Sequence, residues 1–140
     1  LIKKISLKNP DIKFIIVGSK EEEKLYLDQI IKNIESQKII NLFGKSLTLT
    51  AAYMKKSKLL IGNDSGLTHL ASATKLRSIV LFGPTNDKVY GPFDTNSNTV
   101  RTKESYEYFK SLKIDKNKSY MNSISVEEVY DIVKIRGYCA

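Results

Sequence analysis

Residues 60–71 read Leu-Ile-Gly-Asn-Asp-Ser-Gly-Leu-Thr-His-Leu-Ala. The apolar start is typical of a short buried strand, and the polar turn that follows leads into a helix predicted over residues 67–75. The first turn of a helix exposes unpaired N–H groups and carries a partial positive charge, so it favours a phosphate or pyrophosphate. Gly66 lets a ligand oxygen approach the backbone closely, and Ser65 and Thr68 add hydroxyl donors. The turn is therefore a candidate anion-binding site.

The same turn also has a purely structural interpretation. Asp64 or Ser65 then caps the helix, and His69, about one turn into it, packs in the core. The tripeptide Asp-Ser-Gly on its own favours this structural interpretation, because it is common at helix starts. The sequence on either side of the turn is therefore needed to distinguish the anion-binding interpretation from the structural one.

The alternation of strand and helix extends along most of the chain. Strands are predicted at residues 13–18, 39–42, 59–62, 78–82 and 98–102, and helices at 20–35, 48–56, 67–75 and from Ser125. Short connections between alternating elements favour right-handed βαβ units and one parallel sheet covered on both faces. Such sheets bind ligands beyond the carboxyl ends of their strands, where the turns after Val17, Ile61 and Phe82 are expected. The pattern predicts an α/β, Rossmann-like fold, and 140 residues suit a single domain, 1–140.

The apolar spacing also predicts which helix faces are buried. The expected inward residues are Leu25, Ile30 and Ile34 in the first long helix, Leu49, Ala52 and Tyr53 in the second, and Val126, Val129, Ile132 and Val133 in the last. Glutamates 21–23 fall in a first helical turn, where the helix dipole favours negative charge. Ser125 and Glu128 have the spacing of a capping box.

Composition excludes several classes of function. The net charge is +8, but only three of the 23 basic residues are arginines (Arg77, Arg101, Arg136) and the lysines are scattered, so no nucleic-acid partner is expected. Weak attraction to phosphate-rich lipid surfaces remains open. A single cysteine, Cys139, forms no internal disulfide, which suits a reducing compartment, and one histidine with one cysteine makes no zinc site.

Two stretches together resemble the paired signature of family 9 glycosyltransferases, which include the ADP-heptose lipopolysaccharide heptosyltransferases. Residues 63–71 are similar to Asp-Ser/Thr-Gly-x-x-His-Leu-Ala, and residues 80–87 to the stretch around Phe/Tyr-Gly-Pro-Thr-Asp-Pro, with Asn86-Asp87 standing where the family has Asp-Pro. Gly18 with glutamates 21–23, and residues 41–47 and 121–129, resemble further family stretches in order and spacing. The resemblance covers nearly the whole chain.

The resemblance implies the C-terminal half of a GT-B glycosyltransferase, the domain that binds the nucleotide sugar ADP-heptose. It implies that residues 64–69 hold the diphosphate, that a glutamate at 21–23 accepts hydrogen bonds from the ribose, and that the turn at 44–46 borders the adenine. Residues 85–87 are then expected near the diphosphate or sugar. The donor-binding residues so expected are Gly18, Glu22, Glu23, Gly44, Lys45, Asp64, Ser65, Gly66, Leu67, Thr68, His69, Thr85 and Asp87.

The resemblance also implies parts that lie outside this chain. An amino-terminal domain is expected to hold the lipopolysaccharide core or lipid A acceptor and the general base, so no catalytic residue is assigned here and the chain alone is expected to be inactive. We expect no metal and no cofactor. The expected location is cytoplasmic, with peripheral contact at the inner membrane.

Two other classes of protein share parts of this pattern. A sugar-nucleotide epimerase also uses an Asp-Ser-Gly turn, but it usually continues with glycine and a nearby glutamate pair, where this chain has Leu67-Thr68-His69. A non-catalytic nucleotide- or anion-binding module, such as a receiver-like domain, needs a phosphoacceptor aspartate with an acidic pair nearby, which the sequence does not show.

Overall fold

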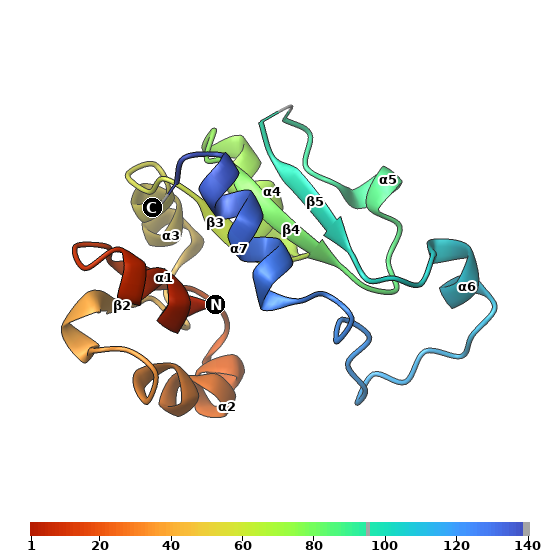
Figure 1. The fold of residues 1–140 in the computed structure, drawn as a ribbon, viewed down its shortest axis with the longest axis horizontal. Helices are drawn as coiled ribbons and strands as arrows, with labels where there is room; N and C mark the ends of the chain where they lie inside the picture. Colours follow the sequence, from red (N-terminus) through yellow and green to blue (C-terminus); the bar gives the residue numbers. More distant parts are fainter. Residues whose placement is uncertain (95, 139–140) are drawn as a thin grey trace. The chain divides into compact units, whose positions relative to one another are not determined.

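The computed structural model describes residues 1–94 and 96–138 (Figure 1). Cys139, the single cysteine, lies outside these residues. The chain divides into two compact units, one made of Leu1–Tyr53 with the C-terminal residues from Tyr130, the other of Met54–Val129.

The first unit contains a pair of parallel strands. In chain order it has α1 (Ile2–Lys8), β1 (Phe14–Ile16), α2 (Lys20–Ile31), a 3-10 turn η1 (Ser36–Lys38), β2 (Ile39–Asn41) and most of α3 (Leu47–Met54). β1 and β2 pair from Phe14 with Ile39 to Ile16 with Asn41. Both predicted strands and both predicted helices of this part are confirmed, and α2 ends at Ile31, four residues earlier than expected.

The second unit contains a three-stranded parallel sheet in the order β3-β4-β5 (Figure 1). Its elements are β3 (Leu60–Asn63), α4 (Gly66–Ala73), β4 (Ser78–Phe82), α5 (Asp87–Tyr90), β5 (Asn98–Arg101) and α6 (Tyr106–Lys110), and the last helix, α7 (Val126–Ile135), starts in this unit and ends in the first. The central strand β4 is almost wholly buried, and Ala71 of α4 packs with Met54 and Leu76. The core therefore holds β3 and α4 firmly on either side of the turn between them.

The strands are parallel and flanked by helices, as predicted, but they form two sheets where the sequence predicted one. Within the described residues β1 pairs only with β2, and β3 only with β4. The predicted common edge therefore holds for the turns after β3 and β4, which belong to one sheet. The turn after β1 belongs to the other sheet.

Two helices differ from the predicted burial pattern. In α2, Leu25 is 62% exposed, so the predicted stripe is wrong at its first residue. Ile30 is half-buried and Ile34, just beyond the helix, is buried, as predicted. In α3 the buried residues are Thr50 and Met54, while the predicted Leu49 and Ala52 are exposed and the predicted Tyr53 is half-buried. Thr50 tolerates burial because its hydroxyl donates to the carbonyl oxygen of Ser46 at 3.0 Å, which satisfies the polar group.

The last helix confirms most of its predicted stripe. Val129 and Val133 are buried, Ile132 is half-buried, and Val126 at the start is exposed. Ser125 caps the helix, since its hydroxyl accepts the Glu128 N–H at 3.0 Å. Among the described helices, none combines the length and apolar character that a membrane crossing needs.

Candidate functional site

The turn between β3 and α4 is anchored to the neighbouring strand. Asn63 pairs with Leu81 of β4, and the Asp64 N–H donates to the Leu81 carbonyl at 3.3 Å. Ser65 is the N-cap residue with extended backbone (φ −159°, ψ 170°), and its exposed hydroxyl makes no capping hydrogen bond. The capping interpretation therefore does not explain the Ser65 side chain.

The start of α4 presents unpaired backbone donors. Within the described part of the chain, the N–H groups of Ser65, Gly66 and Leu67 donate to no protein acceptor. A Cβ atom built on Gly66 would meet no atom within 4 Å, so the space beside this residue is open. Three free donors at the positive end of an eight-residue helix form a surface suited to an anion.

Thr68 has a different role from the one expected. Its side chain is buried, and its hydroxyl donates to the carbonyl oxygen of Asn63 at 2.9 Å. In this structure the Thr68 hydroxyl therefore donates its hydrogen within the protein and not to a ligand. Thr68 instead ties the first turn of α4 to the end of β3.

His69 lies next to an exposed aromatic residue. Its ring is 5.8 Å from that of Phe93, centroid to centroid, at an interplanar angle of 43°. His69 is half-buried, and Phe93 is 83% exposed. The structural alternative of a histidine packed in the core is therefore wrong.

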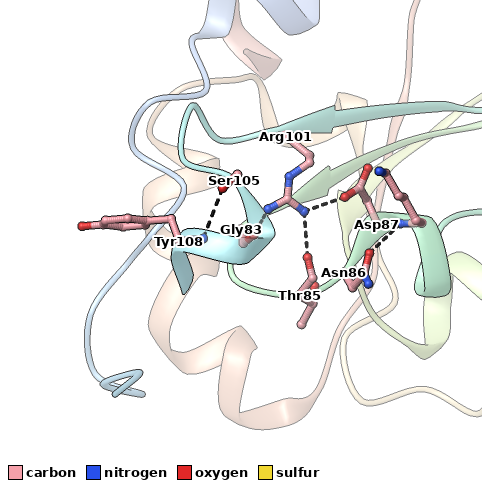
Figure 2. A network of polar contacts seen from close by, with 8 residues as sticks. Gly83, Thr85, Asn86, Asp87, Arg101, Ser105 and Tyr108 are labelled. Atoms are coloured by element: carbon pink, nitrogen blue, oxygen red, sulfur yellow. Dashed lines mark hydrogen bonds and ion pairs between the residues drawn. The ribbon is translucent and has the colours of Figure 1, made fainter. Parts of the chain in front are cut away.

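The loop after β4 is held by Arg101, a residue that the sequence reasoning did not assign to the site (Figure 2). Arg101 Nη1 donates to the Thr85 carbonyl and to Asp87 Oδ1, both at 2.7 Å, and Nη2 donates to the Gly83 carbonyl at 3.0 Å. The Asp87 carboxylate is thus engaged in an ion pair with Arg101. Asn86, which replaces the family's usual aspartate, accepts the Lys88 N–H and caps α5.

In the first unit, Gly18 and Glu22 take part in the start of α2. The Ser19 N–H donates to Glu22 Oε2 at 2.7 Å and the Glu22 N–H to the Ser19 hydroxyl at 3.2 Å, a complete capping box. A Cβ on Gly18 would lie 2.7 Å from the Phe43 ring, so this position has no room for a side chain. Both residues have a structural role whether or not they also contact a ligand.

Glu23 is oriented by the strand beside it. Asn41, the last residue of β2, donates from Nδ2 to Glu23 Oε1 at 2.7 Å, and its Oδ1 accepts the Phe43 N–H at 2.9 Å. Asn41 was part of the family resemblance but was not predicted as a site residue. The fixed carboxylate lies at the carboxyl end of the β1–β2 pair.

Gly44 and Lys45 form the turn that follows. Gly44 has φ of +65°, and its N–H donates to the Gly18 carbonyl at 2.8 Å, so it joins the turns after β1 and β2. Lys45 is exposed, and its N–H donates to the Leu42 carbonyl at 3.2 Å. This left-handed turn explains the glycine in structural terms.

The predicted site residues thus fall into two groups, each at the carboxyl end of its own sheet. The second unit brings together residues 64–69, Thr85 and Asp87, and the first brings together Gly18, Glu22, Glu23, Gly44 and Lys45. No cluster of three or more histidine, cysteine, aspartate or glutamate side chains suited to a metal ion occurs in residues 1–94 and 96–138.

Comparison with known proteins gives a consistent family. The model of glycosyltransferase family 9 (heptosyltransferase) matches residues 2–121. The chain is similar to lipopolysaccharide heptosyltransferase 1 of Campylobacter coli, with 31% identity over 136 residues that cover 96% of this chain and 39% of that protein. It is 28% identical to lipopolysaccharide heptosyltransferase 3 of Escherichia coli (strain K12) over 113 residues, 80% of this chain and 33% of that protein.

Solved structures agree with the family. The family 9 glycosyl transferase from Veillonella parvula DSM 2008 matches with a TM-score of 0.74 and 26% identity, over 96% of this chain and 40% of that one. The E. coli heptosyltransferase WaaC, solved with ADP, matches with a TM-score of 0.73 at 16% identity, over 96% of this chain and 38% of that one, a likeness that shows the fold.

The extent of these matches defines what the chain represents. It spans 33% to 40% of the length of these relatives, and its fold is that of their C-terminal part, in heptosyltransferases of the GT-B type. The family match covers far more than half of the chain. The protein therefore belongs to glycosyltransferase family 9.

Proposed function

We propose that this chain binds the nucleotide-sugar donor of a glycosyltransferase that builds the lipopolysaccharide core, and that the donor is ADP-heptose. One observation supports this most strongly. The start of α4 presents unpaired N–H groups at Ser65, Gly66 and Leu67 with open space at Gly66, on the sheet edge where α/β proteins bind ligands.

The adenosine part of the proposal rests on the first unit and on the relatives. Glu23, fixed by Asn41, offers a carboxylate for the ribose hydroxyls, and the turn at Gly44 and Lys45 offers a border for the base. Among the solved relatives, the heptosyltransferase WaaC of E. coli was solved with ADP, and a second E. coli enzyme is an ADP-heptose heptosyltransferase. These relatives favour an adenine nucleotide over other bases.

The proposed chemistry follows from the anion-binding turn. An acceptor hydroxyl attacks the anomeric carbon of the donor sugar, the bond from that carbon to the diphosphate oxygen breaks, and ADP leaves. Negative charge grows on the departing oxygen as the bond breaks. N–H groups fixed at the start of α4 stabilise that charge without having to reorganise.

The remaining parts of the reaction belong to a longer protein. We propose that a further domain supplies the general base and binds the lipopolysaccharide core or lipid A acceptor. The proposed location is the cytoplasmic side of the inner membrane, where the net charge of +8 favours peripheral contact with anionic lipid.

Calorimetric titration with ADP-heptose, UDP-glucose and GDP-mannose tests the donor. We expect saturable binding of ADP-heptose and at least about tenfold weaker binding of the other two, a difference of ~1.4 kcal/mol. Equal affinity for all three would contradict the adenine assignment. If none of the three nucleotide sugars binds, the proposed function is wrong.

A further inference from the structure

Arg101 connects the end of β5 to the loop that follows β4. It pairs in register with Phe82, the last residue of β4, and its guanidinium then reaches three acceptors in the next five residues (Figure 2). Two of these acceptors are backbone carbonyls, at Gly83 and Thr85. The side chain therefore fixes the path of the loop backbone.

The loop is also fixed from another side. A Cβ on Gly83 would lie 3.1 Å from Met121 Cγ and 3.7 Å from the Tyr120 carbonyl oxygen, so the backbone here is closely packed. The Arg101 side chain is 19% exposed and that of Asp87 is 23% exposed, so the ion pair is largely shielded from solvent. The loop has contacts that specify one conformation.

The fixed loop lies next to the anion-binding turn. β4 is the direct neighbour of β3, and Leu81, two residues before Gly83, accepts the Asp64 N–H. Thr85, whose carbonyl is bound by Arg101, has an exposed side chain. The guanidinium thus sets where Thr85 stands relative to a diphosphate held at Gly66.

We propose that Arg101 is a positioning residue for the donor diphosphate, acting through the backbone of residues 83–87. This inference rests on the proposed function and adds a residue to it. The planar, rigid fork of arginine suits three acceptors at fixed places, whereas the point charge of lysine does not. Arg101→Lys therefore keeps the charge and loses most of the geometry.

The test compares ADP with AMP, which lacks the terminal phosphate. The 140-residue chain is titrated with both nucleotides as wild type, Arg101→Met, Arg101→Lys and Arg77→Met. Arg77→Met is the matched control, since it makes the same chemical change just before β4, at the opposite end of the same sheet, on an exposed side chain.

We expect Arg101→Met to weaken ADP binding at least about tenfold (~1.4 kcal/mol) and AMP binding less than about threefold. Arg101→Lys should lie in between, and Arg77→Met should bind both as wild type does. Melting curves follow each variant, and if Arg101→Met does not fold, Arg101→Lys provides the same comparison.

Each alternative result has a distinct meaning. If the Arg101 variants melt at lower temperature but keep the wild-type ratio of ADP to AMP affinity, Arg101 is only structural and the inference is wrong. If the wild-type chain does not prefer ADP to AMP, the proposed function fails and the inference fails with it.

Discussion

Asn41 holds the carboxylate of Glu23, with 2.7 Å between Nδ2 and Oε1. The orientation of the Asn41 amide is fixed in turn, because its Oδ1 accepts the Phe43 N–H at 2.9 Å. A carboxylate with one oxygen so bound still has lone pairs for the hydroxyls of a ribose. If Glu23 is the ribose acceptor, Asn41 supports it without touching the ligand.

This relationship predicts the effect of Asn41→Ala on ligand choice. ADP affinity should fall about three- to tenfold, in keeping with ~1 kcal/mol for one hydrogen bond, because Glu23 loses its fixed orientation. The loss of binding free energy for 2′-deoxy-ADP should be less than half of the loss for ADP, because 2′-deoxy-ADP already lacks one ribose contact. Calorimetry with both ligands measures the difference.

Asn33→Ala is the matched control for this prediction. Asn33 belongs to the same unit, and its side chain donates to the Gln29 carbonyl near the end of α2. That variant should leave both affinities unchanged. An equal loss of ADP and 2′-deoxy-ADP affinity in Asn41→Ala would show that Asn41 does not act on the ribose.

Gly44 is predicted to resist substitution for a conformational reason. Its φ of +65° is unfavourable for any residue with a side chain, and a Cβ there would clash with Cγ of Lys20. Gly44→Ala should lower the free energy of unfolding by about 1 to 2 kcal/mol, and more if Lys20 does not move aside. Urea unfolding followed by circular dichroism measures the loss.

Gly62→Ala is the comparison for Gly44→Ala. A Cβ at Gly62 meets no atom within 4 Å, and its φ is not in the left-handed region. This variant should therefore be neutral or stabilising by up to ~1 kcal/mol. Equal destabilisation by the two substitutions would contradict the conformational explanation.

Glu104 is predicted to make stability depend on acid pH. A hydrogen bond from the Thr102 hydroxyl to Glu104 Oε2 at 2.6 Å is the main cause that lowers the pKa of this carboxyl. The contribution of a carboxyl with a lowered folded-state pKa is present above its unfolded pKa of about 4.3 and is lost as pH falls through the folded value. Melting temperature should therefore fall less below pH ~4.3 in Glu104→Gln than in the wild type.

The control for this pH dependence is Glu107→Gln, the same chemical change in the first turn of α6. Melting temperatures of the three proteins are compared across the acid range. If the melting temperature of Glu104→Gln falls with pH as steeply as that of the wild type, the Thr102 hydrogen bond does not contribute to the acid dependence of stability.

Much of the local structure was predictable because it depends on short-range signals. The run from Leu60 to Ala71 specifies a strand, a turn and a helix within twelve residues, and the structure has β3 and α4 there. The capping hydrogen bond at Ser125 was likewise predictable from spacing. These features require only neighbours in the sequence.

The features that sequence reasoning missed depend on contacts between distant residues. Arg101 binds carbonyl groups 16 and 18 residues earlier in the chain. The sequence does not indicate which backbone carbonyls accept a hydrogen bond from a side chain. One signal was present, namely an arginine near the end of the strand predicted at residues 98–102. The buried face of α3 was not predicted because threonine is polar and was not expected in the core. The Thr50 hydroxyl is satisfied there by its hydrogen bond to the Ser46 carbonyl.

Ser65→Ala gives a graded test of the anion-binding turn. The Ser65 hydroxyl makes no capping bond, so its removal should leave the melting curve unchanged. If the hydroxyl donates to a charged phosphate oxygen, ADP binding should weaken by about 1.5 to 3 kcal/mol. A lower melting temperature with unchanged ADP affinity would instead indicate a helix cap.

Calorimetric titration of ADP into the wild-type chain and Gly66→Val tests the assigned site most directly. A side chain at Gly66 meets no protein atom within 4 Å, so the variant should fold as the wild type does, and melting curves check this. The added side chain occupies the space where a phosphate oxygen must approach the backbone N–H groups. We predict saturable ADP binding to the wild type and its loss in Gly66→Val, whereas unchanged ADP affinity in the folded variant would contradict the assignment of this turn.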